Sequence, residues 1–135
     1  AWVAVAGTLS WSAVYLSLAL MTYIAGFDIL YACQDIDFDR QEGLFSMPAA
    51  LGAKKAMAVS SLLHVMTLGF LCAMHLSFGM HPVFWGFIGL IGILLAVEHR
   101  LVKPDDLTRI DMAFFHINSV ISVLLLAGVI VQGVM

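Results

Sequence analysis

The sequence predicts an all-α, polytopic membrane helix bundle with about four transmembrane helices. Of its 135 residues, 62% are hydrophobic and only 11% are charged, and the mean hydropathy is +1.02. A soluble domain carries roughly 25% charged residues, so this chain lacks the charge to cover a water-facing surface. The apolar residues also gather into runs long enough for a helix to cross a bilayer, which takes about 20 residues.

Four such runs occur, at residues 10–34, 53–77, 82–98 and 112–134. Glycine, alanine and serine are frequent within them, as in "GFIGLIGILLA", and small residues let helices approach closely in lipid. The third run is the shortest, and we expect Glu98, His99 and Arg100 to form its solvated polar end. The histidines share no metal-ligand spacing, so packing or interfacial roles are expected for them. Residues 1–135 form one unit.

The basic residues predict an orientation for the bundle. Three of the six Lys and Arg residues lie between the first and second runs, counting the two lysines at the start of the second, and three lie between the third and fourth, whereas "FGMHP", between the second and third, has none. Two crossings separate the basic connections, so both face the same side, which the positive-inside rule assigns to the cytoplasm. The partner expected from this composition is the lipid bilayer. Nucleic acid is not expected, because six basic residues form no basic face.

The first run ends in a cluster of carboxylates, "FDILYACQDIDFDR". With about 100° of rotation per residue, Tyr31, Asp35 and Asp39 lie within about 60° of Asp28 around a helix. Asp37 falls on the opposite side. A solvated helix end explains Asp37 well, but it explains Asp28 poorly, because a carboxylate about two turns inside an apolar segment is costly and usually faces a polar interior.

Three carboxylates on one helix face repel one another unless a cation shares the site. Hard oxygen ligands suit Mg²⁺, which commonly bridges carboxylates to substrate phosphates. The stripe therefore predicts a metal-bound phosphate ligand at the cytoplasmic mouth of the bundle. Ion or proton handling is the alternative from a different class, since acidic residues inside membranes also serve as relays.

The stretch "GFDILYACQDIDFDRQEGLFSMP" resembles the second aspartate-rich motif of the UbiA family of intramembrane aromatic prenyltransferases. That motif reads D-x-x-Y-A-x-x-D-x-x-x-D, followed by a basic residue, a glycine and a serine. The matching residues here are Asp28, Tyr31, Ala32, Asp35, Asp39, Arg40, Gly43 and Ser46. "EHRLVKPDDLTRIDMAFFHIN" is similar to the late cytoplasmic loop and last helix of the bacterial quinone-pathway members.

The resemblance covers the C-terminal part of a nine-helix family fold. The family's first motif, N-x-x-x-D-x-x-x-D, is absent from this chain. The chain is therefore expected to be the C-terminal half of such an enzyme and to be inactive alone, with a missing N-terminal half as a further partner. A split protein and an inactive remnant are the alternatives.

The resemblance implies transfer of a polyprenyl group from a polyprenyl diphosphate to an aromatic acid in quinone synthesis at a bacterial inner membrane. It implies Asp35 and Asp39 as Mg²⁺ ligands and, with Asp28, as catalytic residues. Asp28 and Tyr31 are placed at the diphosphate and acceptor end. Arg40 is a diphosphate contact or a membrane-anchor arginine. The first expected acceptor is 4-hydroxybenzoate; dihydroxynaphthoate, for menaquinone, is the alternative, and a non-catalytic membrane fragment is the competing class.

Overall fold

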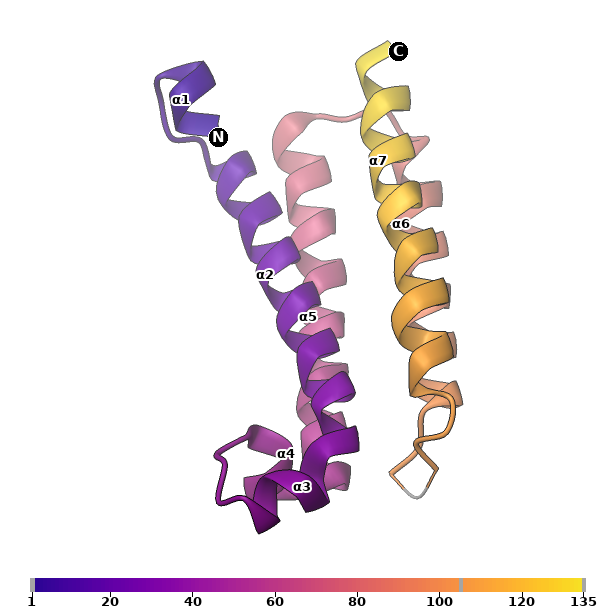
Figure 1. The fold of residues 1–135 in the computed structure, drawn as a ribbon. Helices are drawn as coiled ribbons and strands as arrows, with labels where there is room; N and C mark the ends of the chain where they lie inside the picture. Colours follow the sequence, from indigo (N-terminus) through magenta and orange to yellow (C-terminus); the bar gives the residue numbers. More distant parts are fainter. Residues whose placement is uncertain (1, 105, 135) are drawn as a thin grey trace.

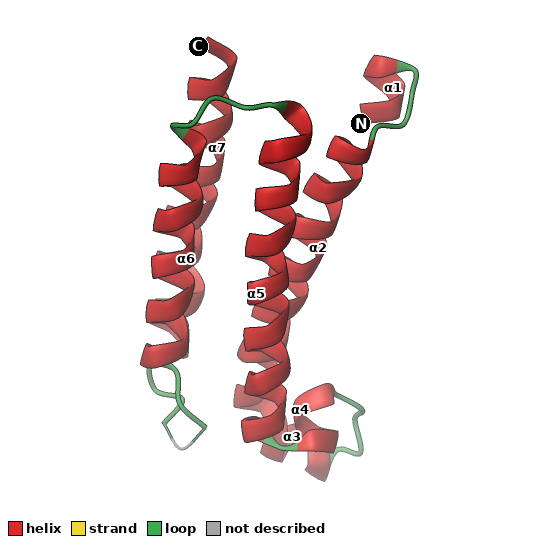
Figure 2. Cartoon of the chain, turned by 180° about the vertical axis from the view of Figure 1, so that it is seen from behind, coloured by secondary structure: helices red, strands yellow, loops and turns green. Residues whose placement is uncertain are grey.

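The computed structural model describes residues 2–104 and 106–134, and this part of the chain is helical with no strand. Figure 1 traces the helices along the chain, and Figure 2 shows that only loops connect them. The elements are α1 (Trp2–Ala6), α2 (Trp11–Ala32), the 3₁₀ turn η1 (Cys33–Asp35), α3 (Ile36–Gln41), α4 (Met47–Leu51), α5 (Ala53–Phe78), α6 (Phe84–Leu101), the π-helical turn η2 (Met112–Ile117) and α7 (Asn118–Val134).

Four helical segments are long and apolar enough to cross a membrane, namely Trp11–Gln41, Ala53–Phe78, Phe84–Leu101 and Phe115–Val134. The predicted all-α bundle with four spans is therefore confirmed. Large apolar side chains point away from the bundle on several helices, and Val65, Ile93 and Val123 are each more than half exposed. Water does not favour so much exposed apolar surface, whereas lipid tails do. The chain is a multi-pass membrane protein.

Both basic connections lie at the same end of the bundle. In Figure 1, α3, α4 and the connection between α6 and η2 are at the bottom, while α1 and the connection between α5 and α6 are at the top. The aspartate-bearing end of α2 therefore shares an end with the basic residues, as the four-crossing layout predicts. The assignment of this end to the cytoplasm stays a prediction.

Helices α2 and α5 pack along much of their length through small and polar side chains. Three pairs of hydrogen-bonded residues join them: Ser12 with Ser77, Thr22 with Thr67, and Ser60 with the carbonyl of Gly26. The Ser60 hydroxyl lies 2.6 Å from the Gly26 oxygen, and Ser60 is completely buried. Such a contact requires close backbones, which glycine and serine permit.

Helices α6 and α7 form the second close pair. A methyl group at Gly128 would lie 3.0 Å from the Phe84 ring and 3.1 Å from the Phe87 ring, so the rings of α6 pack directly on the backbone of α7. At the upper end, the amide of His81 donates a hydrogen bond of 2.7 Å to the Gln132 side chain. Figure 2 shows this pair beside α5, with α2 beyond it.

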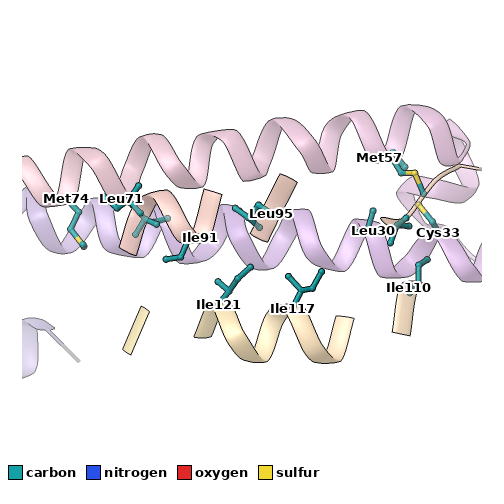
Figure 3. Packing of buried hydrophobic residues seen from close by; sticks show 14 of the residues in the cluster. Leu30, Cys33, Met57, Leu71, Met74, Ile91, Leu95, Ile110, Ile117 and Ile121 are labelled. Carbon is teal, nitrogen blue, oxygen red and sulfur yellow. The ribbon is translucent and has the colours of Figure 1, made fainter. Parts of the chain in front are cut away.

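One hydrophobic core runs through the bundle. Figure 3 shows Ile117 and Ile121 pointing from η2 and α7 toward α2, and Met57 of α5 lying beside Cys33 at the lower end of α2. Among the side chains that the structure describes, the buried apolar residues that contribute are Ala19, Leu30, Cys33, Ala56, Met57, Leu71, Met74, Phe84, Ile88, Ile91, Leu95, Val102, Ile110, Ile117 and Ile121. This core fixes how the four spans lie around the cavities described below.

The helix ends follow local chemistry. The Ser10 side chain accepts a hydrogen bond from the amide of Ala13 and so caps α2. Gly79 ends α5 in the left-handed conformation at φ 60°, which favours glycine. At its far end, the first run remains helical through η1 and α3 to residue 41, beyond the expected 34. The third helix is shifted to 84–101 from the expected 82–98.

The connection between α6 and η2 is held by Asp106. Its backbone pairs with that of Lys103, and its carboxylate accepts hydrogen bonds from the hydroxyl of Thr108 at 2.6 Å and the amide of Thr108 at 3.1 Å. These bonds, the hydroxyl first, hold the pKa of the Asp106 carboxyl below its usual range. The side chain is exposed, so its contribution is local to this turn.

Candidate functional site

Asp28 opens onto a groove between α2 and the start of the last span. The groove has a volume of about 390 Å³, and its walls are Tyr23, Ile24, Phe27 and Asp28 of α2 facing Phe115, Asn118, Ser119 and Ser122. The carboxylate therefore shares the groove with an amide and two hydroxyl groups contributed by α7. A carboxylate placed deep in a membrane-spanning helix is expected to face such a polar interior.

The 3₁₀ turn η1 changes the register of the aspartates. A 3₁₀ helix advances about 120° per residue instead of about 100°, so three residues rotate the following segment by about 60°. Asp35 lies at the end of this turn and is exposed, whereas Asp39 lies in α3 and is half-buried. Together with Asp28 they therefore spread over a wider arc than a continuous α-helix would give. Asp37 is exposed as well.

The carboxylates suit a metal that a substrate helps to hold. Within residues 2–104 and 106–134, no three His, Cys, Asp or Glu side chains gather closely enough to hold a metal ion by themselves. Mg²⁺ does not need such a cage, because it usually keeps several waters and binds one or two carboxylates together with substrate phosphates. Asp35 and Asp39, which follow the groove along the chain and do not line it, are carboxylates of the kind that such a site uses.

Tyr31 and Arg40 have structural roles at this end. Tyr31 is half-buried and packs against the hydrophobic core. The Nε of Arg40 donates a hydrogen bond of 2.9 Å to the carbonyl of Ala49, and so ties α3 to α4. Ser46 caps the start of α4, and its side chain accepts a hydrogen bond from the Ala49 amide. Arg40 thereby fixes the loop that flanks the aspartates.

A second cavity lies above the groove, between all four spans. Its volume is also about 390 Å³, and its walls are almost entirely apolar. The lining residues come from α2, α5, α6 and α7, and they are Leu16, Ala19, Leu20, Tyr23, Thr67, Leu71, Ile91, Ile121, Ser122, Leu125, Leu126 and Val129. Tyr23 and Ser122 line both spaces, so an apolar ligand in the cavity would adjoin a polar group in the groove.

A buried polar cluster joins α5 to the end of α6. Nδ1 of His64 lies 2.9 Å from Nε2 of His99, and Nδ1 of His99 lies 3.2 Å from the hydroxyl of Ser61. A carboxylate oxygen of Glu98 is 3.9 Å from His64, and both side chains are about 2–3% exposed. The expected solvated end is therefore wrong for Glu98. The helix continues past it because these groups bond one another inside the bundle.

Sequence reasoning missed the residues that α7 and the middle of α2 contribute. Asn118 and Ser122 are four apart, so they share a helix face, but their spacing matches no recognisable chemical motif. Tyr23 is about 140° around the helix from Asp28 and lies outside the aspartate stripe. An apolar run of this kind carries no signal for either group until the packing of α2 against α7 is known.

The chain was compared with families and with individual proteins. Its sequence matches the UbiA prenyltransferase family over residues 1–120. Comparison with curated proteins and with solved structures gives no match. The family match spans most of the 135 residues and includes all four aspartates of the first span. The chain therefore belongs to the UbiA prenyltransferase family.

Proposed function

We propose that this protein serves Mg²⁺-dependent transfer of a polyprenyl group from a polyprenyl diphosphate to an aromatic acid in quinone biosynthesis. The observation that carries the proposal is that, in this member of the UbiA family, the apolar cavity adjoins the groove that Asp28 lines. We propose 4-hydroxybenzoate as the acceptor. The proposed location is the inner membrane of a bacterium, with the aspartates on the cytoplasmic side, where the water-soluble aromatic acid and Mg²⁺ are available.

The two spaces suit the two ends of a prenyl donor. An isoprenoid chain has no hydrogen-bonding group, so the apolar walls of the cavity can cover it without loss of hydrogen bonds. A diphosphate is anionic and needs polar partners or a cation, which the polar side chains of the groove and the aspartates that follow it along the chain could offer. In such an arrangement the bond that breaks would lie on the Asp28 side of the boundary between the two spaces.

Asp35 and Asp39 would hold Mg²⁺ with the help of the diphosphate. The ion would neutralise charge that develops on the leaving pyrophosphate. Asp28 and Tyr31 are proposed to position the diphosphate and the acceptor. Arg40, whose Nε bonds Ala49, is proposed to donate to the phosphate oxygens through the amino groups of its guanidinium. The apolar bundle excludes water, which would otherwise capture the allylic cation.

The test compares four substitutions of the full-length protein in membrane vesicles. Asp35→Asn and Asp39→Asn should each lower kcat/KM by about 10²-fold or more, because they weaken charge stabilisation at the leaving group. Asp37→Asn is the matched control and should be nearly silent, since a solvated charge contributes little. Asp28→Asn should also be impaired. Pyrophosphate release is followed with a prenyl diphosphate, 4-hydroxybenzoate and a range of Mg²⁺ concentrations.

The same assay separates the alternatives. Release with dihydroxynaphthoate but not with 4-hydroxybenzoate would correct the acceptor and leave the reaction class in place. Equal tolerance of substitution at residues 35, 37 and 39 would mean that the aspartates form only a polar helix end. An ion flux that Asp28→Asn abolishes, with no dependence on a diphosphate, would favour ion handling.

A further inference from the structure

A helical hairpin at the basic end of the bundle leaves large apolar side chains uncovered. It consists of α3, the connection at residues 42–46 and α4. At its tip, Phe45 is 93% exposed and Leu44 is 53% exposed. We propose that this hairpin is an interfacial anchor, whose tip inserts between the lipid headgroups of the leaflet at that end. The anchor goes beyond the prenyl transfer proposed above and does not depend on it.

The tip is held in place by hydrogen bonds within the hairpin. Gly43, just after α3, takes the left-handed conformation at φ 66°. The amide of Leu44 donates a hydrogen bond of 2.8 Å to the carbonyl of Asp39, and the bond from Arg40 to Ala49 closes the hairpin. None of these bonds uses the two apolar side chains of the tip. The hairpin therefore presents them outward on a fixed backbone.

The start of α5 marks the level of the membrane boundary. Lys55, Leu62 and Val65 share one face of α5, because spacings of seven and three residues return to the same side of a helix. Leu62 and Val65 are each more than half exposed, so this face is turned toward lipid. A lysine at the end of such a face extends its ammonium group to the headgroups. The boundary therefore lies close to Lys55.

The hairpin lies at this boundary. Gly52 alone separates α4 from α5, and the two helices are in contact. On the other side, the helical run Trp11–Gln41 has 31 residues, which at 1.5 Å per residue is about 46 Å and exceeds the hydrocarbon thickness of about 30 Å. Figures 1 and 2 show that the connection from α3 to α4 turns back and projects to the side, away from α6 and α7. The tip is therefore beside the bundle at headgroup level.

The chemistry of the hairpin suits lipid better than a protein surface. Apolar side chains on an interfacial segment enter the boundary between headgroups and acyl chains to a depth of about 5–10 Å. The same hairpin carries exposed carboxylates at Asp37 and Glu42, which would need charged partners in a dry protein interface. Among headgroups they stay hydrated. An anchored tip also holds α3, and with it Asp39, at the level of the headgroups.

The experiment measures the surroundings of a spin label at the tip. Phe45→Cys and Glu42→Cys are made in an otherwise cysteine-free background of the full-length protein, labelled, and placed in phosphatidylcholine nanodiscs. Power-saturation EPR compares collisions with oxygen, which concentrates in lipid, and with a water-soluble nickel chelate. The ratio of oxygen to nickel collisions should be severalfold higher at 45 than at 42. Position 42 is the matched control, because it is an exposed polar position of the same connection.

A fluorescence measurement gives an independent answer without a label. Phe45→Trp, in a background whose other tryptophans are replaced by phenylalanine, should be quenched by lipids that are brominated near the headgroup and should resist iodide in the water. Gln41→Trp, at the exposed end of α3, should show the reverse. The same quenching pattern for the two tryptophans would contradict the anchor.

The other outcomes of the EPR measurement are equally decisive. Equal collision ratios at positions 45 and 42 would place the tip in water and would overturn the anchor. Low collision rates at 45 with both reagents would show that protein covers the tip, either a second copy or a partner, and would overturn it too. Neither measurement needs a prenyl diphosphate or an aromatic acceptor, so the anchor and the proposed reaction can fail separately.

Discussion

Gly26→Ala should loosen the contact between α2 and α5. A methyl group at this position would lie 2.7 Å from Cδ2 and 2.8 Å from Nε2 of His64, and 3.1 Å from the carbonyl oxygen of Ser60. Carbon atoms pack best at about 3.5–4.0 Å, so either the helices separate or His64 leaves its place by about 1 Å. His64 has little freedom, because it is bonded to His99 and buried among three helices.

The cost can be worked out from these contacts. Forcing an extra methyl group into a packed interior costs about 1–3 kcal/mol. A separation of about 1 Å would also stretch the 2.6 Å bond from Ser60 to the Gly26 carbonyl beyond hydrogen-bond range, which costs about 1 kcal/mol more. Alanine gains about 1 kcal/mol over glycine in a helix. The expected net loss is therefore about 1–3 kcal/mol of stability.

The assay is reversible unfolding in mixed bicelles, compared with Gly69→Ala in α5. A methyl group at Gly69 meets nothing within 4 Å, so this control should be neutral or slightly stabilising. Helix propensity alone predicts the same gain in the free energy of unfolding for both variants. Close packing at Gly26 predicts a loss of stability for Gly26→Ala and no loss for Gly69→Ala. Equal stability of the two variants would refute the close approach of α2 to α5 at Gly26.

Two further predictions concern the ends of the bundle. The first places single cysteines at Gln41, His81 and Asp106 in a background without Cys33 and Cys72 and labels them with an impermeant reagent. Cysteines at 41 and 106 should react from the inner face of the membrane, and the cysteine at 81 from the outer face. Reaction of the cysteine at 81 from the same face as that at 41 would contradict the layout. Thr108→Val should raise the pKa of Asp106 toward its ordinary value, because it removes the 2.6 Å hydrogen bond. A carboxyl whose pKa is lowered by folding stabilises the turn at pH values above its unfolded pKa, and this stabilisation is lost as the pH falls through the folded pKa. The variant should therefore lose the stabilisation at a higher pH than wild type, which the ¹³C shift of the Asp106 carboxyl would follow. An identical titration of the two proteins would show that the Thr108 hydroxyl has no effect.

The fold class could be predicted from the sequence because lipid imposes a simple rule. Each span must be apolar over about 20 residues, and the four runs stand out for that reason. Their exact ends could not be predicted in the same way. Residues 99–101 extend α6 beyond the predicted end, where Glu98 is buried beside His64 of another helix. A partner in a distant part of the chain leaves no local signal at residue 98.

The aspartates illustrate how far a periodic pattern can be extended. The spacing of Asp28, Asp35 and Asp39 predicts a shared face only if every residue turns by about 100°. Three residues of 3₁₀ geometry at Cys33–Asp35 interrupt that register, and nothing in the letters "CQD" requires them. Cys33, the first residue of this turn, packs into the core beside Met57 and is 1% exposed, a contact with a distant part of the chain that the local sequence does not reveal.

The polar cluster inside the bundle shows the opposite limit. Histidine is a common packed residue, and neither His64 nor His99 has a neighbour in sequence that completes a motif. Their bond exists because α5 and α6 run side by side in opposite directions and bring residues 35 positions apart within 2.9 Å. Burial makes that bond valuable, since a polar side chain among apolar helices has few other partners. The cluster therefore follows from the order of the helices in the bundle, which hydropathy alone does not specify.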